Sequence, residues 1–84
     1  REQIVGLINN LIQDTSVPKN VRACLQTAKM SLTEKQDLAE AVSGAIYALD
    51  EVSNDLNLPM HARTMIWNVL SDLEKLKEES SGSA

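Results

Sequence analysis

The sequence predicts an all-α protein, a compact four-helix bundle made of two tandem helical hairpins. Apolar residues recur at helical spacing along most of the chain, and two breaks each place a proline at the start of the next helix. In addition, the two halves of the chain can be aligned with each other. A chain of 84 residues has room for one domain. We expect that domain to span residues 1–77.

The first hairpin begins with a helix expected over residues 2–12, where Ile4, Ile8 and Leu11 share one face. A break follows at residues 14–18. Pro18 suits the first turn of a helix, and Ser16 before it is a good N-cap. The second helix is therefore expected from about residue 17 to residue 30.

The second hairpin is expected to begin at a capping box, because residues 31–34 read Ser-Leu-Thr-Glu. This pattern predicts a third helix over about residues 32–52. Gly44 lies inside it at a cost of about 1 kcal/mol relative to Ala, and both a close helix approach and a tolerated surface glycine would explain it. A second break at 54–59, with Asn57 as N-cap, predicts a fourth helix over about 58–77.

These boundaries divide the domain into hairpins at about residues 2–30 and 32–77. The remaining segment, residues 78–84, is polar and rich in Ser and Glu, so it has little apolar surface to bury. We expect it to be a frayed or disordered tail.

Shifting the chain against itself by about 41 residues brings the two breaks into register. An Asp before a helix can accept loop amides and complements the positive helix N-terminus, and an Arg one turn into the helix can reach back to that Asp. We interpret the shared Asp and Pro as structural turn residues; chance similarity of two helix starts and a substrate-binding Asp–Arg pair remain alternatives. The coinciding pairs are Asp14 and Asp55, Pro18 and Pro59, and Arg22 and Arg63.

The repeated pattern resembles a HEAT repeat, whose turn carries an Asp and whose second helix opens with Val-Arg, as at Val21 and Arg22. Here, however, the gap between the Asp and the Val is longer and contains Pro18. Two repeats are also fewer than the three or so that a solenoid usually needs. We therefore expect a closed bundle in preference to a HEAT-like stack.

A more specific resemblance lies in two stretches, LDEVSNDLNLPMHARTMIWNVL over residues 49–70 and DTSVPKNVR over residues 14–22. Together they resemble a small archaeal family, the uncharacterised protein family 0147. The resemblance covers about residues 4–76 and implies a short, helical, intracellular archaeal protein. It supplies no activity, cofactor or site residue.

The composition disfavours several classes of function. A net charge of −4 opposes general attraction to nucleic acid or to an anionic membrane. Cys24 is the single cysteine, which excludes an intramolecular disulfide, and we expect it in the core. No apolar run approaches the ~20 residues that span a bilayer. No secretory signal is visible, so the default expectation is a cytoplasmic protein.

No pattern of catalytic or metal-binding residues stands out. His61 is the single histidine, near Asp55 in sequence, and a His–Asp pair can do acid–base chemistry. A partly exposed residue at the start of a helix is the simpler interpretation, and metal-ligand spacing is absent. We expect no catalytic residue, cofactor or metal, and hence no enzyme. A small-molecule site at the inter-hairpin cleft around Asp55, His61 and Arg63 is one alternative.

Two equivalent helix faces differ between the halves. The second helix carries a basic stripe, a candidate nucleic-acid contact and the basis of a second alternative, a nucleic-acid- or ribosome-associated accessory protein. The fourth helix is apolar at the equivalent positions, and Trp, Met and Arg are enriched at protein interfaces. Packing of this face under the tail or the other hairpin is the alternative interpretation. The leading hypothesis is a non-enzymatic module that binds a protein or itself. The basic stripe is Lys19, Arg22 and Lys29; the candidate partner-binding residues are Met60, Arg63, Trp67 and Leu70.

Overall fold

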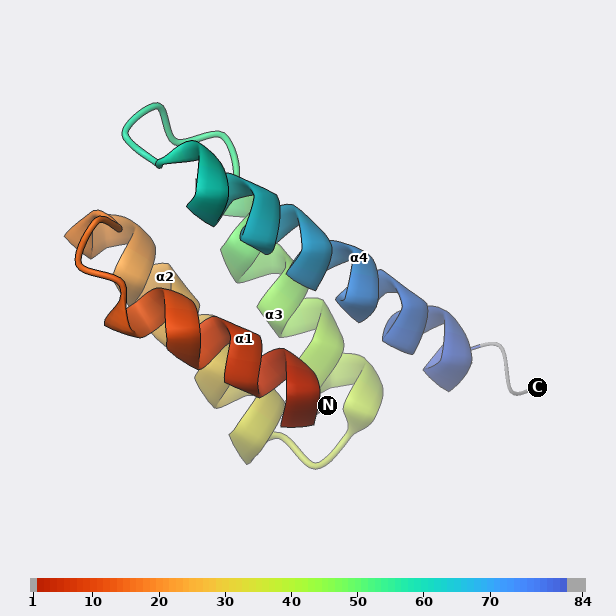
Figure 1. Cartoon of the computed structure of the whole chain (residues 1–84). Coiled ribbons are helices and arrows are strands. Elements are labelled where there is room, and N and C mark those ends of the chain that lie inside the picture. The colour runs from red at the N-terminus through yellow and green to blue at the C-terminus, as the bar shows by residue number, and fades with distance from the viewer. Residues whose placement is uncertain (1, 82–84) are drawn as a thin grey trace.

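Four helices make up the computed structural model, which describes residues 2–81 (Figure 1). They are α1 (Glu2–Gln13), α2 (Lys19–Glu34), α3 (Leu38–Val52) and α4 (Met60–Ser81). The described residues contain no strand. The predicted all-α class and the count of four helices are confirmed.

The helices close into a bundle. α3 packs against both α2 and α4, and α1 also packs against both α2 and α4. In a HEAT-like stack α1 would not reach the last helix, so the contact between α1 and α4 identifies a closed bundle, as expected. The α1–α2 loop and the α3–α4 loop lie at the same end of the molecule (Figure 1). We call this the loop end.

The core is aliphatic and draws on all four helices. Ile8, Leu25, Leu49 and Ile66 are fully buried, one from each helix. Val17 and Leu58, which precede the two prolines, are buried as well and cover the core at the loop end. Both hairpins therefore contribute to one continuous apolar cluster, and burial of this surface is the main force that holds them together.

α2 and α3 pack together more extensively than any other pair of helices. A Cβ added at Gly44 would overlap the Ser31 Oγ on α2, and that Oγ donates a hydrogen bond of 2.9 Å to the Ala41 carbonyl on α3. Gly44 is thus explained by close helix approach, one of the two interpretations left open by the sequence. Between α1 and α4 the aligned positions carry larger residues, Gln3 for Gly44 and Asp72 for Ser31, and these helices pack less extensively.

The predicted capping box at residues 31–34 is wrong. α2 continues through it to Glu34, because Leu32 extends the buried face of α2 and is itself fully buried. The N-cap of α3 is Asp37, whose side chain accepts a hydrogen bond of 2.9 Å from the Ala39 amide. The helical hairpins accordingly run over residues 2–34 and 38–81 instead of 2–30 and 32–77.

Three further expectations need correction. Ser16 does not cap α2, since Pro18 occupies the N-cap position, and Asn57 does not cap α4, which begins at Met60. The predicted frayed or disordered tail is wrong for residues 78–81, which continue α4 to Ser81. Residues 82–84 of that tail lie outside the described residues.

Candidate binding surface and the paired loops

The two loops are built by the same set of bonds. In the first, Asp14 Oδ1 accepts from the Ser16 amide at 2.9 Å, and in the second, Asp55 Oδ1 accepts from the Asn57 amide at 2.8 Å. The prediction that each Asp accepts a loop amide is confirmed. This bonding also explains why Asn57 does not act as an N-cap: its amide is held by Asp55 within the loop.

The two arginines act as clamps on these loops. Arg22 Nη2 donates to the Asp14 carbonyl at 3.0 Å, and Arg63 Nη2 donates to the Asp55 carbonyl at 2.9 Å. The Arg does reach back to the Asp as expected, but it contacts the backbone carbonyl and leaves the carboxylate free for another partner.

Each carboxylate uses its second oxygen to reach the other hairpin. Asp14 Oδ2 lies 2.7 Å from His61 Nε2, and Asp55 Oδ2 accepts from Asn20 Nδ2 at 2.9 Å. Asn20 and His61 occupy equivalent positions in the repeat, so the two cross-links are reciprocal. The carboxylate that pairs with His61 is thus that of Asp14 in the opposite loop, although Asp55 is nearer in sequence.

This environment stabilises both carboxylates in the ionised form. The Ser16 hydroxyl, His61 and the Ser16 amide together lower the pKa of Asp14 from 3.8 to about 2. Hydrogen bonds from Asn20 and Asn57 lower the pKa of Asp55 as well. The loop end therefore carries two fixed negative charges, one at the start of each of α2 and α4, where the helix dipole favours them.

Ser16, His61 and Asp14 are the residue types of a hydrolase triad, but their geometry differs from one. Ser16 Oγ donates to Asp14 Oδ1 at 2.6 Å, and the same His61 Nε2 that contacts Asp14 lies 3.5 Å from Ser16 Oγ. In a triad the imidazole contacts Ser with one nitrogen and Asp with the other, so that it can accept the Ser proton. Here one nitrogen faces both, an arrangement that suits a structural cross-link.

The predicted partner-binding strip is only partly exposed. Met60 is 70% exposed and Trp67 is 51% exposed. Leu70 is half-buried and packs against the core, whereas Arg63 is half-buried and clamps its loop. The structure thus leaves Met60 and Trp67 as the two accessible apolar members of this strip.

The predicted basic stripe is less accessible than its sequence suggests. Lys19 is exposed at the first turn of α2 and Lys29 is half-buried. Arg22 donates to the Asp14 and Val17 carbonyls. Of these three basic residues, Lys19 alone is therefore exposed.

Three large apolar side chains outside these predictions are also exposed: Tyr47 at 72%, Leu56 at 93% and Met30 at 53%. Of the five exposed large apolar residues, all but Met30 lie in the second hairpin. The residues aligned with these four in the first hairpin are polar or small. The repeat alignment could therefore have revealed this difference from the sequence. The pairs are Tyr47 and Gly6, Leu56 and Thr15, Met60 and Lys19, and Trp67 and Gln26.

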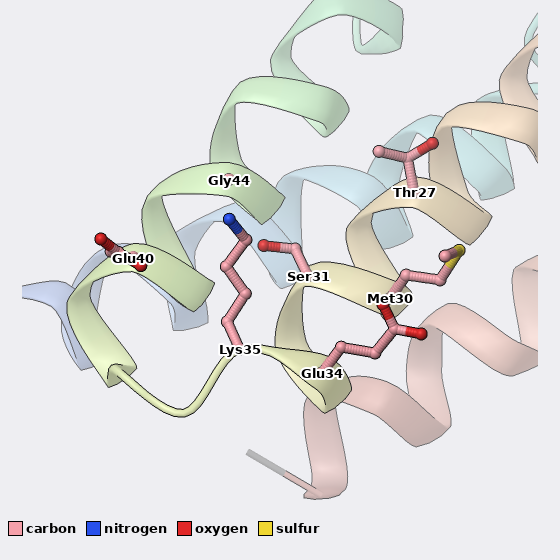
Figure 2. A pocket seen from close by; sticks show the side chains of 7 residues that line it. All are labelled: Thr27, Met30, Ser31, Glu34, Lys35, Glu40 and Gly44. Atoms are coloured by element: carbon pink, nitrogen blue, oxygen red, sulfur yellow. The ribbon is translucent and has the colours of Figure 1, made fainter.

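A groove of about 540 Å³ lies between α2 and α3 (Figure 2). Met30, Ser31 and Glu34 line it from α2, and Glu40 and Gly44 line it from α3. A smaller cavity of about 210 Å³ lies between α1 and α4, lined in part by Gln3 and Asp72. The larger groove is the most spacious of the cavities described for the bundle.

Cys24 is half-buried beside the core, as a small apolar residue would be, and burial together with the charge of Glu51 raises the pKa of its thiol. Among residues 2–81, no group of three His, Cys, Asp or Glu side chains is placed to hold a metal ion. None of the described helices is both long and apolar enough to cross a bilayer.

Comparison with known proteins places the chain in a family. The profile of the uncharacterised protein family UPF0147 matches residues 1–76. The chain is 43% identical over 72 residues to the UPF0147 protein MJ1419 of Methanocaldococcus jannaschii, covering 84% of this chain and 77% of that protein. It is 45% identical over 78 residues to the UPF0147 protein TK2131 of Thermococcus kodakarensis, covering 90% and 94%.

A solved structure is similar over most of the fold. The crystal structure of the unknown-function protein MMP1188 matches with a TM-score of 0.81 and 40% sequence identity, covering 87% of this chain and 84% of that one. The family resemblance seen in residues 14–22 and 49–70 is thereby confirmed in sequence and in fold. The chain belongs to the uncharacterised protein family UPF0147.

Proposed function

We propose that this chain is a non-enzymatic protein-interaction module, which binds a protein partner or a second copy through the outer strip of α4. The strip consists of Met60 and Trp67, with Leu70 at its inner edge and Leu56 in the adjoining loop. One observation carries the proposal: the two hairpins share their core and turn residues, but the exposed apolar side chains are concentrated in the second hairpin.

Folding does not account for these side chains. Burying a large apolar side chain contributes about 1.5–3 kcal/mol, yet Met60 is 70% exposed and about half of Trp67 stays in water within this chain. The first hairpin builds the same helices with Lys19 and Gln26 at the equivalent positions. Trp residues are also frequent among the few side chains that dominate binding energy at protein interfaces. These points support a role in binding for the strip.

The test is sedimentation or light scattering of the wild type and of Trp67→Ala over a wide concentration range, combined with affinity capture from a native lysate. Gln26→Ala, at the equivalent position of the first hairpin, is the matched control. We expect an assembly or a specific captured protein that Trp67→Ala weakens about tenfold or more and Gln26→Ala leaves unchanged. A protein that stays monomeric and captures nothing specific in any form would contradict the proposal.

A cytoplasmic location is part of the same proposal. It rests on the expectation drawn from the sequence, in which no apolar run approaches the length that spans a bilayer. Fractionation of cells that produce the full-length protein, followed by immunodetection, tests it. Recovery with the membrane or secreted fraction would count against it.

A further inference from the structure

A groove lies at each of the two seams between the hairpins, one between α2 and α3 and one between α1 and α4, and the two differ in volume. The groove between α2 and α3 contains Ser31, Glu34 and Gly44, and the cavity between α1 and α4 contains their repeat equivalents Asp72, Lys75 and Gln3. The first has about 540 Å³ and the second about 210 Å³. Gly44, which lines the first groove, is aligned with Gln3, whose longer side chain lines the second. Comparison with the second groove therefore shows which features of the first do not follow from the repeated fold alone.

The α3 wall of the open groove continues beyond the cavity. Glu40, Gly44, Tyr47 and Glu51 follow one another at spacings of three and four residues, so they share one face of α3. Gly44 faces Ser31 of α2, and Glu40 lines the cavity together with residues of α2, so this line of residues borders the groove. An exposed Tyr47 thus lies on the same face of α3 as the cavity.

The α2 wall supplies the opposite side. Met30 lines the cavity from α2 and is 53% exposed. Between the two helices the floor is formed by Ser31 of α2 and Gly44 of α3, and the Ser31 side chain points toward Gly44 (Figure 2). A floor of small residues allows the backbone of a third helix to come close.

The charges at the rim are mainly negative. Glu34 and Glu40 line the cavity, and Glu51 lies farther along the same face of α3. Lys35 is the single cation lining this groove; its side chain extends over the floor toward Gly44 (Figure 2). Complementary charges across an interface favour association and select the partner. The rim therefore favours a cationic occupant.

We propose that the α2–α3 groove binds an amphipathic helix of a partner protein that has basic residues flanking its apolar face. Its apolar side chains contact Met30 and Tyr47 over the Gly44 floor, while its Lys or Arg residues pair with Glu40 and Glu51. Lys35 moves aside on binding. This surface is separate from the Met60–Trp67 strip, so each proposal can fail without the other.

The experiment is a titration of the uniformly ¹⁵N-labelled full chain with an amphipathic helical peptide of Leu and Lys, about 18 residues long, or ~27 Å as a helix. The acidic counterpart, with Glu in place of Lys, is the control peptide. We expect the Leu/Lys peptide to shift the amide signals of Thr27, Ser31 and Gly44, and the acidic peptide to leave them unchanged. Lys35→Ala is expected to tighten binding severalfold because it removes the opposing charge.

Charge reversal provides the matched variants. Glu40→Lys/Glu51→Lys is expected to weaken binding about tenfold, as two solvent-exposed ion pairs of up to ~1 kcal/mol each allow. Glu74→Lys/Glu78→Lys changes the net charge by the same amount on α4 and should leave the affinity within about twofold. The proposal is overturned if both double variants lose affinity equally, if the acidic peptide binds as well, or if the shifted signals lie along Met60–Trp67 instead. The last outcome would support the proposed function while excluding the groove.

Discussion

Gly44 and Ser31 set the separation of α2 and α3 through a single atomic contact. The Ser31 Oγ occupies the space that a Cβ at position 44 would need, whereas the Ser31 Cβ would lie at 3.4 Å, an ordinary van der Waals separation. Because the Oγ also donates to the Ala41 carbonyl, it cannot rotate away without losing that bond. The two residues should therefore be energetically coupled.

We expect Gly44→Ala alone to lower the free energy of unfolding by about 1 kcal/mol, because the overlap outweighs the gain in helix propensity. In a Ser31→Ala background the overlap is removed. There the same Gly44→Ala change should raise the free energy of unfolding by up to ~1 kcal/mol. Urea denaturation of the four proteins in this cycle measures the coupling. Equal effects of Gly44→Ala in both backgrounds would show that the contact does not limit helix approach.

Asp14 makes the stability of the fold depend on pH at acidic values. Its pKa is lowered from 3.8 to about 2 in the folded protein, so the folded state favours the ionised form. The resulting stabilisation is fully present above the unfolded-state pKa near 3.8 and is lost as the pH falls through about 2.

Asp14→Asn tests this linkage, because an Asn oxygen can still accept from the Ser16 amide while the charge is removed. We expect the wild type to melt at a higher temperature than Asp14→Asn at pH 6, and the difference to vanish near pH 2 as the wild-type carboxyl becomes protonated. Thermal melts followed by circular dichroism give the comparison. A difference that stays constant between these pH values would mean that the charge of Asp14 has no role.

The local chemistry of these turns can be predicted from the sequence, but their long-range partners cannot. The spacing of Asp14 and Asp55 before their prolines indicated acceptors for loop amides, and the structure contains both bonds. Nothing local indicated that His61 would pair with Asp14, since that pair joins residues 47 positions apart. Such partners depend on how the two hairpins dock, which the loop sequences do not encode.

At the scale of elements, the error at residues 31–34 has a clear physical cause. The Ser-x-x-Glu pattern marks a helix start only where the residues before it are not helical. Here those residues belong to α2, which continues to Glu34. Leu32 sits at helical spacing after Leu25 and Ala28, and its burial stabilises the continued helix. A cap contributes about 1 kcal/mol, less than the burial of a Leu, so tertiary packing decides the boundary.

The helices also differ in how firmly the bundle holds them. α3 buries six residues and packs extensively on α2, whereas α1 buries three and packs less extensively on α4. We expect amides of α1 to exchange with deuterium faster than those of α3, because less buried surface must be exposed to release α1. Hydrogen exchange read by NMR or mass spectrometry measures this order. Equal protection of α1 and α3 would indicate that the bundle opens only by global unfolding.

At the scale of the whole molecule, two similar hairpins form an asymmetric bundle. The aligned halves predict that the α2–α3 and α1–α4 seams pack alike, yet α1 and α4 pack together less extensively than α2 and α3. Side-chain volume explains the difference, because Ala45 and Ala48 of α3 replace Ile4 and Leu7 of α1 at the aligned positions. The difference in side-chain volume is visible in the sequence. Its effect on helix packing can be predicted only once it is known which helices pair.

Because both hairpins contribute to one apolar cluster, neither should unfold without the other. The chain carries a natural probe of this expectation, since its single Trp, Trp67, reports on the second hairpin alone, whereas circular dichroism reports on all four helices. In urea both signals should give one transition with the same midpoint. Ile8→Val, a change in the fully buried core of α1, should lower the free energy of unfolding by about 0.5–1.5 kcal/mol in both signals equally.

Ile46→Val is the control in the second hairpin, at a half-buried position that packs against the same core. It should shift both midpoints together and by less than Ile8→Val, because a half-buried side chain leaves a smaller cavity when it is shortened. If Ile8→Val moved only the dichroism midpoint, the hairpins would be separate folding units. Cooperative unfolding requires instead that a cavity in the first hairpin destabilise the helix that carries Trp67, and it can do so only through the shared core.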